Sequence, residues 1–367
     1  MPIIECVEFS AYDVPTVAPE SDGTAEWSKT TLVVAELRCE GEIGLGYTYA
    51  DTGTAHLARD VLAPHVIGRD PYDVRLVFEA MDHAARNHGR GGACAMAISA
   101  LDVAAWDLKA KLLGLPLARL IGRVRDAIPA YGSGGFTSLS MKELEEQLGG
   151  WADAGMRFLK MKVGRDPARD MTRVRAARSA AGRAELFVDA NGAYGVKEAL
   201  RVAGQLADQG VTWFEEPVVR TDLAGLRLLR ERAPMEIAGG EYGYELSDFR
   251  TFLDEPRALD VIQADATRCG GVTGFLQAAA LLESFHCPMS SHCAPALHVA
   301  LACAVPGMRH VEWFADHARI EEMLFEGAPR LERGLLRPPL DRPGLGLSLA
   351  QKEAGRHRVV APAAAAT

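Results

Sequence analysis

The sequence lacks several features that would point to particular classes of function. It has no excess of basic residues, since 40 Lys and Arg stand against 49 Asp and Glu, and the formal net charge is -9. Nucleic acids and anionic membranes favour basic patches, so we expect neither as a partner and expect a small-molecule substrate instead. No stretch reaches the ~18 uninterrupted apolar residues of a membrane span, and the N-terminus lacks a basic region followed by an apolar run. We therefore expect no anchor and no targeting segment.

Paired cysteines of the CxxC type are also absent. The seven cysteines are odd in number and scattered along the chain. This pattern favours neither a disulfide framework nor a zinc site. We expect reduced thiols and a cytoplasmic protein.

The chain is long enough, at 367 residues with 48% hydrophobic residues, for two domains or for a barrel with a smaller attached domain. Residues 1 to about 50 alternate like antiparallel strands, with a hairpin turned at Glu40-Gly41. Residues 55 to 122 are helical in period. An α+β domain is therefore predicted over residues 1–124.

From about residue 127, eight short strand candidates alternate with seven helical stretches. Charged residues end most of these strands, at spacings of 24 to 29 residues. Such a period corresponds to one strand, one loop and one helix, and its repetition favours a closed parallel barrel over residues 125–320, with a doubly wound sheet as the competing arrangement. Because the strand ends of a barrel converge on one face, we expect these charged residues to be neighbours.

The last part of the chain, residues 321–367, is rich in turn-forming residues in "LRPPLDRPGLGLSLAQKE". We expect this segment to pack back on the first domain. The final "APAAAAT" is expected to be frayed.

One strand candidate, "FLKMKVG", places Lys160 and Lys162 on one face and apolar residues on the other. An edge strand with both ammonium groups in water would have the same pattern. A lysine close to a metal and to another cation would instead have a pKa lowered toward ~7–8, where it acts as a base.

Three carboxylates, Asp189, Glu215 and Glu241, end three successive strands in "LFVDANG", "WFEEP" and "IAGGE". Each alone is compatible with a solvated acid at a strand end. Together they would repel one another unless a cation is bound, and hard oxygen ligands suit Mg²⁺. In the pair Glu215 and Glu216, the phase of the strand favours Glu215 as the inward ligand.

Further along the chain, Asp265 in "QADATRCGG" and His292 in "SSHCAP" end the next two strands. A carboxylate beside an imidazole orients the ring and raises its basicity, which makes a general base. Glu312, in "VEWF", ends the last strand and could donate a hydrogen bond to a developing oxyanion if protonated. A plain carboxylate at the barrel rim is the alternative for Glu312.

In this order, the motifs KxK, DxN, EEP, GE, DxxRxGG, SSH and a final glutamate resemble the enolase superfamily, specifically its mandelate racemase subgroup with its acid-sugar dehydratases. Each motif is weak alone, but the ordered set is specific and covers nearly the whole chain. The resemblance implies an α+β capping domain over a (β/α)7β modified TIM barrel. It also implies one Mg²⁺ per subunit, which holds a carboxylic acid substrate while a base removes the α proton.

The resemblance also assigns roles to individual residues. The implied metal ligands are Asp189, Glu215 and Glu241, and the implied bases are Lys162 on one face and His292 with Asp265 on the other. Lys160 would touch the substrate carboxylate, Glu312 would stabilise the enediolate, and Asn191 would contact the substrate. Muconate-cycloisomerase-like relatives carry Asp as the third ligand and a lysine in place of the Asp/His pair, so Glu241 and His292 argue against that branch.

Two bases on opposite faces allow racemisation or epimerisation of a 2-hydroxy acid, or dehydration. We favour dehydration of a sugar acid to a 2-keto-3-deoxy acid, because such acids are the commonest substrates attached to this resemblance. Tyr131, Ser133 and His298 offer hydrogen bonds to hydroxyl groups, although His298 could equally be satisfied within the barrel wall.

In the cap loops, Trp27, Tyr47 and Tyr49 either line the pocket or only pack the cap. A homologue that binds a metal and an acid without catalysis stays open, although it would be expected to lack a base or a ligand. Barrels of this kind are expected to form symmetric homo-oligomers.

Overall fold

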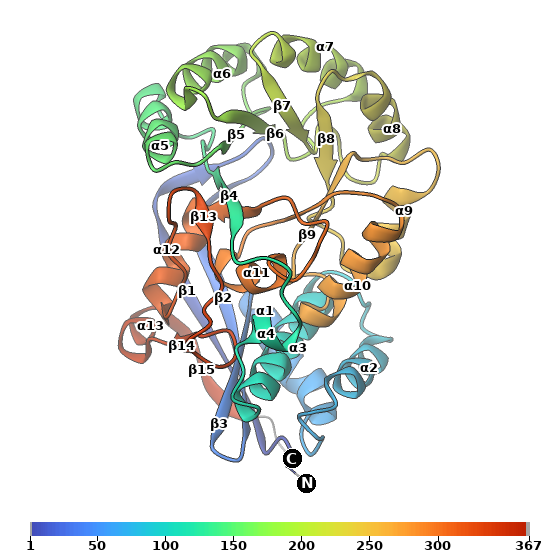
Figure 1. Ribbon diagram of the computed structural model, residues 1–367, viewed down its shortest axis with the longest axis vertical. Coiled ribbons are helices and arrows are strands. Elements are labelled where there is room, and N and C mark those ends of the chain that lie inside the picture. Colours follow the sequence, from blue (N-terminus) through green and yellow to red (C-terminus); the bar gives the residue numbers. More distant parts are fainter. Residues whose placement is uncertain (1, 365–367) are drawn as a thin grey trace.

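The computed structural model describes residues 2–364 and has two parts, a capping domain and a barrel (Figure 1). The cap is a four-stranded antiparallel sheet covered by helices, and its strand order is β15 (Arg358–Ala364), β1, β2 and β3. The expected hairpin turn is present at Glu40 and Gly41, which both have positive φ. The cap elements are β1 (Cys6–Ser21), β2 (Glu26–Cys39), β3 (Glu42–Tyr49), α1 (Thr52–Leu57), the π-helix Ala58–Leu62, the 3-10 helix Ala63–His65, α2 (Val74–Ala85), α3 (Ala93–Leu112) and α4 (Leu117–Leu120).

Close packing of α3 against β3 forms the centre of the cap. Gly44 and Gly46 lie where a Cβ atom would come within 2.2 and 2.0 Å of the backbone oxygens of Ala104 and Ala100. Only glycine allows this approach. The apolar side chains between the sheet and the helices then form a core of the cap's own.

The second part contains the eight expected parallel strands and the seven helices between them, with the helices outside the strands (Figure 1). The strands are β4 (Ile128–Ser133), β5 (Phe158–Lys162), β6 (Glu185–Asp189), β7 (Val211–Glu215), β8 (Glu236–Gly239), β9 (Val261–Ala264), β10 (Met289–Ser291) and β11 (Val311–Phe314). The helices are α5 (Met141–Asp153), α6 (Pro167–Ala181), α7 (Val196–Ala207), α8 (Leu223–Arg232), α9 (Leu246–Leu253), α10 (Gly271–Ser284) and α11 (Pro295–Ala302).

The sheet closes on itself, so the competing doubly wound arrangement is not adopted. The strands follow one another in chain order from β4 to β10, and β11 pairs in parallel with β4. The remaining gap is bridged by backbone hydrogen bonds of Met289 with Gly307 (3.2 Å) and Arg309 (2.9 Å), just before β11. The prediction of a (β/α)7β barrel with an α+β cap is confirmed.

The chain after β11 returns to both parts of the molecule. The strand β13 (Leu335–Leu336) pairs with β4 of the barrel, and β15 (Arg358–Ala364) pairs with β1 of the cap. The frayed end expected from residue 361 is therefore wrong for residues 361–364, while residues 365–367 lie outside the described part of the chain. The other elements here are α12 (Ala315–Leu324), β12 (Phe325–Glu326), β14 (Ser348–Leu349) and α13 (Gln351–His357).

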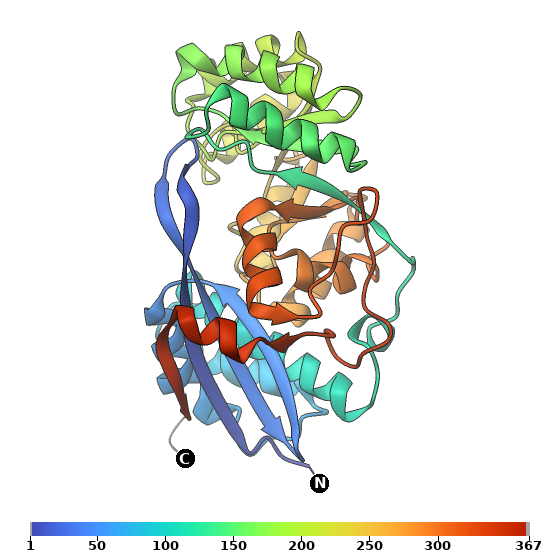
Figure 2. The same ribbon diagram turned by 90° about the vertical axis from the view of Figure 1, so that its left-hand side faces the viewer.

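The hairpin of β1 and β2 extends beyond the cap sheet and reaches the barrel (Figure 2). Its end is fixed there by two hydrogen bonds between Ser21 and Thr137, from the Thr137 N–H to the Ser21 carbonyl (2.8 Å) and between the two hydroxyls (2.6 Å). The hairpin therefore covers the face of the barrel where the strands end. Among residues 2–364, no helix has the length and apolar character needed to cross a membrane.

Buried polar contacts also join the cap to the barrel. The Tyr47 hydroxyl on β3 donates to Glu321 Oε1 on α12 (2.6 Å). The Thr48 hydroxyl donates to the Thr267 carbonyl (2.7 Å). On α3, Asp102 accepts a hydrogen bond from the backbone N–H of Thr273 (2.9 Å). Buried polar groups of this kind are costly unless paired, so these contacts restrict the docking of the two parts.

Candidate active site

The register of three neighbouring strands brings Lys162, Asp189 and Glu215 side by side. Lys162 on β5 is paired with Asp189 on β6, and Asp189 with Glu215 on β7. On β5, Lys160 and Lys162 point into the barrel, although they are only 1% and 6% exposed. The alternative of an edge strand with both lysines in water is therefore wrong.

Glu241 joins this row from the next strand through a turn that requires glycine. Gly240 has φ of +115°, and a Cβ atom there would lie 2.7 Å from the Gln263 carbonyl oxygen. After this turn, Glu241 lies near the other two carboxylates. Asp189, Glu215 and Glu241 each offer an oxygen within 4.8 Å of the others, and Glu216 is not part of the group.

The lysines and carboxylates of this group alter one another's pKa. Burial alone would raise the pKa of Asp189, but the ammonium groups of Lys162 and Lys160 outweigh it and lower the pKa to about 2. Burial would likewise lower the pKa of Lys162, but the Asp189 carboxylate raises it above its usual range. The lowered pKa expected for a lysine close to a bound metal and another cation stays a prediction.

Lys160 lies deeper in the barrel than Lys162. Its Nζ atom is 2.6 Å from Glu215 Oε1 and 2.8 Å from Glu312 Oε1, and it lies 5.3 Å from the centre of the Tyr131 ring. Two residues along a strand correspond to about 6.6 Å, which accounts for the difference in depth. Lys160 is not among the residues that line the cavity, and its contact with a substrate carboxylate stays a prediction.

On the other side of the carboxylates, Asp265 orients the imidazole of His292. The Nδ1 atom of His292 is 2.8 Å from Asp265 Oδ2, while Asp265 Oδ1 accepts hydrogen bonds from the N–H and the hydroxyl of Thr267, both at 2.7 Å. Burial opposes ionisation of Asp265, but the His292 hydrogen bond and charge hold its pKa below the usual range. The Nε2 atom of His292 is left to face the cavity, 3.5 Å from Glu241 Oε2.

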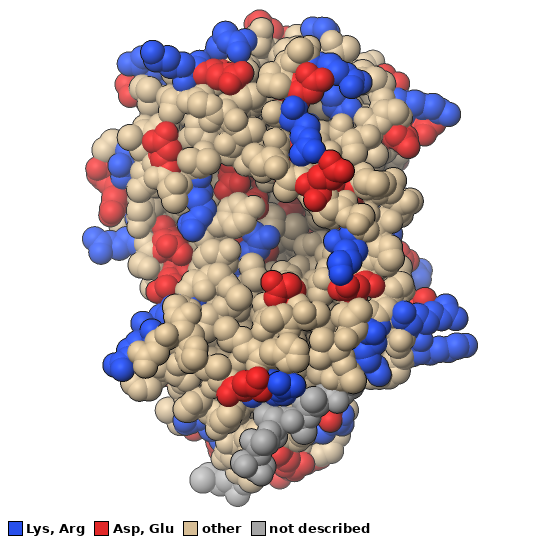
Figure 3. Space-filling view, turned by 180° about the vertical axis from the view of Figure 1, so that it is seen from behind, with Lys and Arg blue, Asp and Glu red and all other residues tan. Residues whose placement is uncertain are grey.

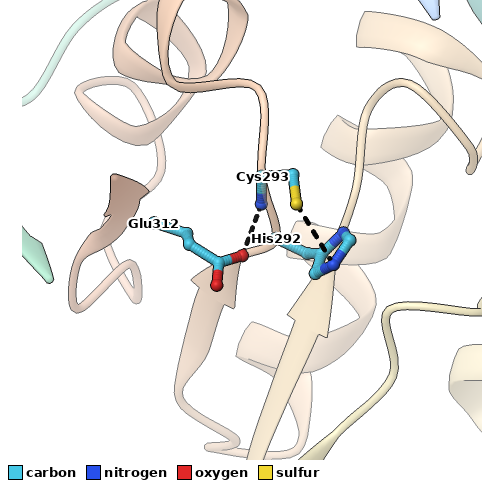
Figure 4. A group of neighbouring side chains, drawn as sticks. All are labelled: His292, Cys293 and Glu312. Atoms are coloured by element: carbon cyan, nitrogen blue, oxygen red, sulfur yellow. Dashed lines mark hydrogen bonds between the residues drawn. The ribbon is translucent and has the colours of Figure 1, made fainter. Parts of the chain in front are cut away.

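Glu312 is an ionised carboxylate that accepts hydrogen bonds. Its Oε2 atom accepts one from the Cys293 N–H (2.6 Å), as Figure 4 shows. Burial would raise the pKa of Glu312, but Lys160 and then His292 lower it below its usual range. The expected protonated form that donates to an oxyanion is thus not the form that this environment favours.

Cys293 is a second group in contact with the base. Its Sγ atom lies 3.3 Å from His292 Nε2 (Figure 4). Cys293 and Ala294 both have positive φ, 51° and 42°, and this turn directs the Cys293 N–H toward Glu312. Burial raises the pKa of the thiol well above its usual value, so Cys293 is a neutral group beside the imidazole.

A cavity of about 340 Å³ lies between the barrel and the cap. Seen from behind, the molecule is hollowed between its upper part, the barrel, and its lower part, the cap, with charges of both signs around the hollow (Figure 3). The cap lines the cavity with Asp22, Trp27, Lys29, Thr30, Thr31, Tyr49, Ala50 and Asp51. The barrel part lines it with Lys162, Asn191, Glu241, Tyr242, Arg268, His292, Cys293, Glu312, Phe314 and His317.

Two of the six expected substrate contacts line this cavity, Trp27 and Asn191. The other four, Tyr131, Ser133, His298 and Tyr47, are completely buried and do not line it. The Tyr131 hydroxyl donates to the Ser291 carbonyl (3.2 Å) inside the barrel.

The remaining three have different surroundings. Ser133 is enclosed at the end of β4, and Tyr47 is occupied by Glu321. His298 accepts the Ala266 N–H at Nε2 (2.9 Å), and its Nδ1 is 2.9 Å from the Cys293 carbonyl. The alternative of a wall residue therefore describes His298.

Comparison with known families covers both parts of the chain. Residues 8–122 match the family described as "Mandelate racemase / muconate lactonizing enzyme, N-terminal domain", and residues 143–354 match "Enolase C-terminal domain-like". This chain belongs to the mandelate racemase/muconate lactonizing enzyme family of the enolase superfamily. The resemblance read from the ordered motifs is confirmed, and with it the expectation of an enzyme, a lyase or an isomerase.

Several relatives in this family match nearly the full length of the chain. L-talarate/galactarate dehydratase of Salmonella typhimurium is 31% identical, over 95% of this chain and 89% of its own. The 3,6-anhydro-alpha-L-galactonate cycloisomerase of Streptomyces coelicolor is 34% identical, over 96% and 99%. Among solved structures, a mandelate racemase/muconate lactonizing enzyme-like protein from Rubrobacter xylanophilus is 49% identical over 97% and 99% of the two chains, with a TM-score of 0.95. A racemase from Streptomyces coelicolor with bound magnesium is 31% identical over 97% and 100%, with a TM-score of 0.91.

The carboxylates of this family member fit a magnesium ion. Asp189, Glu215 and Glu241 supply three hard oxygen ligands, and Glu241 Oε2 is buried without a hydrogen-bond partner. A divalent cation would satisfy this oxygen and would reduce the repulsion that, together with burial, raises the pKa of Glu215.

Several cavity residues of this family member were not singled out from the sequence. Arg268 was visible only as the arginine of the DxxRxGG motif, and its Nε atom lies 3.7 Å from Asp265 Oδ2. Cys293 had a signal in its position directly after His292. Phe314 and His317 had none, because nothing in their neighbourhood distinguishes cavity residues from core residues.

Proposed function

We propose that this chain is a Mg²⁺-dependent dehydratase of a sugar acid. It removes the proton α to the carboxylate and eliminates the β-hydroxyl group to give a 2-keto-3-deoxy acid. The observation that carries the proposal is the placement of two bases on either side of the carboxylate group. Lys162 lies on β5 and His292 follows β10, while the three proposed ligands come from β6, β7 and β8 between them. Both bases line the cavity.

Mg²⁺ held by Asp189, Glu215 and Glu241 would supply positive charge against the substrate carboxylate, which makes the α proton more acidic. It would also weaken the hold of Asp189 on the ammonium group of Lys162, so that the pKa of Lys162 falls from its raised value. In its neutral form, Lys162 Nζ accepts the α proton from one face of the substrate.

His292 acts on the opposite face. The Asp265 carboxylate fixes the ring through Nδ1, so that Nε2 faces the cavity and, in the imidazolium form, holds the proton that is transferred. In the dehydration, this proton leaves with the β-hydroxyl group as water. In a racemisation or epimerisation, the same proton would instead be delivered to the α carbon. Asn191 contributes a substrate contact from the loop after β6.

Lys160 and Glu312 stabilise this arrangement through ion pairs. Lys160 contacts both Glu215 and Glu312, so it compensates the charge of a proposed ligand and of a cavity carboxylate at once. We assign Lys160 as a positioning residue. Glu312, held by Lys160 and by the Cys293 N–H, borders the part of the cavity where the enediolate forms.

The experiment is incubation of the Mg²⁺-loaded protein with a library of mono- and dicarboxylic sugar acids in D₂O, with detection of 2-keto acid and of α-deuterium. We expect keto acid from one or a few stereoisomers. It should be lost in Lys162→Ala and His292→Asn, and kept in Lys142→Ala, where the lysine is 84% exposed on α5. Deuterium uptake without keto acid would assign a racemase or epimerase, and no reaction in either channel would reject the proposal.

We also propose a cytoplasmic location and a symmetric homo-oligomer. All seven cysteines are free, which agrees with a reducing compartment. Light scattering coupled to size-exclusion chromatography measures the number of subunits.

We keep the proposed division at residues 124 and 320, although residue 320 lies inside α12 and a boundary after Leu324 leaves that helix intact.

A further inference from the structure

Each positive charge that borders the cavity already has a carboxylate partner. Lys162 is paired with Asp189, and Lys29 on the cap with Asp13. Arg268 lies between Glu241 Oε1 (3.6 Å) and Asp265 Oδ2 (3.7 Å). Binding of Mg²⁺ to Asp189 and Glu241 would leave Lys162 as the neutral base and Arg268 beside Asp265. The described residues around this cavity therefore leave no unpaired ammonium or guanidinium group for a second carboxylate of a substrate.

The histidine of the cap-facing wall does not supply a charge either. Burial lowers the pKa of His317 well below its usual value, and its ring is stacked on Tyr49 with 3.3 Å between the centroids. His317 is thus a neutral ring at neutral pH.

The cap adds negative charge to this end of the cavity. Asp22 and Asp51 both line it. Asp22 Oδ1 accepts the N–H groups of Thr24 and Ala25 at 2.7 Å, and Asp51 accepts the Thr54 N–H at the start of α1. Both carboxylates accept hydrogen bonds from the backbone, and their charge would repel a second anionic group.

Aromatic rings form one wall of the same cavity. Trp27 and Phe314 each pack edge to face on Phe136 at 5.6 Å, and Phe314 packs on His317 at 4.9 Å. Two polar atoms of this wall are occupied, because Trp27 Nε1 donates to Glu20 (3.0 Å) and the Tyr49 hydroxyl to the His317 carbonyl (3.4 Å). The wall therefore offers ring surface to a ligand, which suits the C–H faces of a carbohydrate chain.

We infer that the substrate is a monocarboxylic acid whose end remote from the metal ligands is uncharged, and that this end packs against the ring surface of Trp27 and Phe314. Aldonic acids and deoxyaldonic acids belong to this class, and the aldaric acids do not. The inference rests on the proposed function and narrows it to one class of acid.

The test compares acids of one configuration that differ only at the remote end, such as galactonate and galactarate, each with its epimers. For the Mg²⁺-loaded protein we expect kcat/KM to be about 10- to 100-fold higher for the monoacid, the range for placing a polar group without a partner. Binding is measured in parallel by thermal stabilisation of the same protein. This second readout does not depend on turnover.

A pair of variants tests the electrostatic part of the argument. Asp51→Asn keeps a side chain that caps α1, so the helix is retained while the charge is removed. We expect it to reduce the preference for the monoacid by about 3- to 10-fold, as for loss of one nearby charge at high effective dielectric. Asp60→Asn, an exposed acid of the cap outside the cavity, is the control and should leave the preference unchanged.

The outcomes distinguish the inferred substrate class from the proposed dehydration. A diacid used as well as its monoacid, or better, overturns the inference and leaves the proposed dehydration standing. Tighter binding of monoacids without any turnover supports the inference and rejects the proposed reaction. Failure of both kinds of acid to bind overturns both.

Discussion

Glu321 is predicted to make the stability of the protein fall as the pH rises. It is completely buried at the junction of cap and barrel, where it accepts hydrogen bonds from the Tyr47 hydroxyl (2.6 Å) and the Ala296 N–H (2.9 Å). Burial raises its pKa from 4.5 to about 8, although these hydrogen bonds oppose the shift. The folded protein therefore binds more protons at this residue than the unfolded chain between these two values.

The sign and size of the effect follow from this difference. Stability is greatest below the unfolded pKa, declines by ~1.4 kcal/mol per pH unit through the window, and is constant above about pH 8. Between pH 6 and 9, only about 2 units lie inside the window, so Glu321 removes ~2.7 kcal/mol of unfolding free energy. Glu321→Gln keeps the shape and one acceptor but has no charge, so it should lack this loss.

The measurement is urea denaturation of wild type and Glu321→Gln at pH 6 and at pH 9. Unfolding is monitored with one spectroscopic probe in the cap and one in the barrel. Other buried acids, such as Asp102 with a pKa raised to about 7 by burial, contribute equally to both proteins and cancel in the comparison. Between pH 6 and 9, wild type should lose ~2.7 kcal/mol more unfolding free energy than the variant. Parallel pH dependences of the two proteins would refute the reasoning about this site.

Three further predictions concern single contacts. Tyr47→Phe leaves Glu321 without its hydroxyl donor and should lower the unfolding free energy by ~1.5–3 kcal/mol, whereas Tyr72→Phe at a half-buried position of the cap should not; equal stability of both variants would contradict it. Asp265→Asn removes the negative charge beside His292 Nδ1 and should reduce kcat by about 10²–10⁴-fold, with an unchanged rate as the contrary result. Mg²⁺ at about 100 times its Kd should stabilise the protein by ~2.7 kcal/mol, and Asp189→Asn should lose this gain; stabilisation that persists in the variant would place the ion elsewhere.

The residues at the ends of the barrel strands could be predicted from the sequence, because two simple rules suffice there. Alternation assigns Lys162 and Glu215 to the inward face, and the repeat of strand and helix brings such ends to one face of a barrel. Depth along the barrel follows from neither rule. Lys160 and Tyr131 are inward too, but they lie below the cavity floor and contact protein groups only.

The contacts of the cap were harder to predict, because they depend on how two folded parts meet. Tyr47 and Tyr49 share one face of β3, yet Tyr47 contacts Glu321 while Tyr49 borders the cavity.

The strand β15 could not be predicted from the sequence for another reason. Its alanines lack the apolar and polar alternation of a strand, and β15 exists because β1 offers an edge for pairing.

That pairing links the order of synthesis to the completion of the cap. Residues 8 to 12 of β1 leave the ribosome before the barrel, and their partners in residues 358–364 leave it after the barrel. During translation the outer edge of β1 stays open while the whole barrel is made, and open strand edges are where chains associate wrongly. A chain truncated before β15 would keep this edge of β1 open permanently. A change to the chain directly after β15 consequently affects β1 as much as β15.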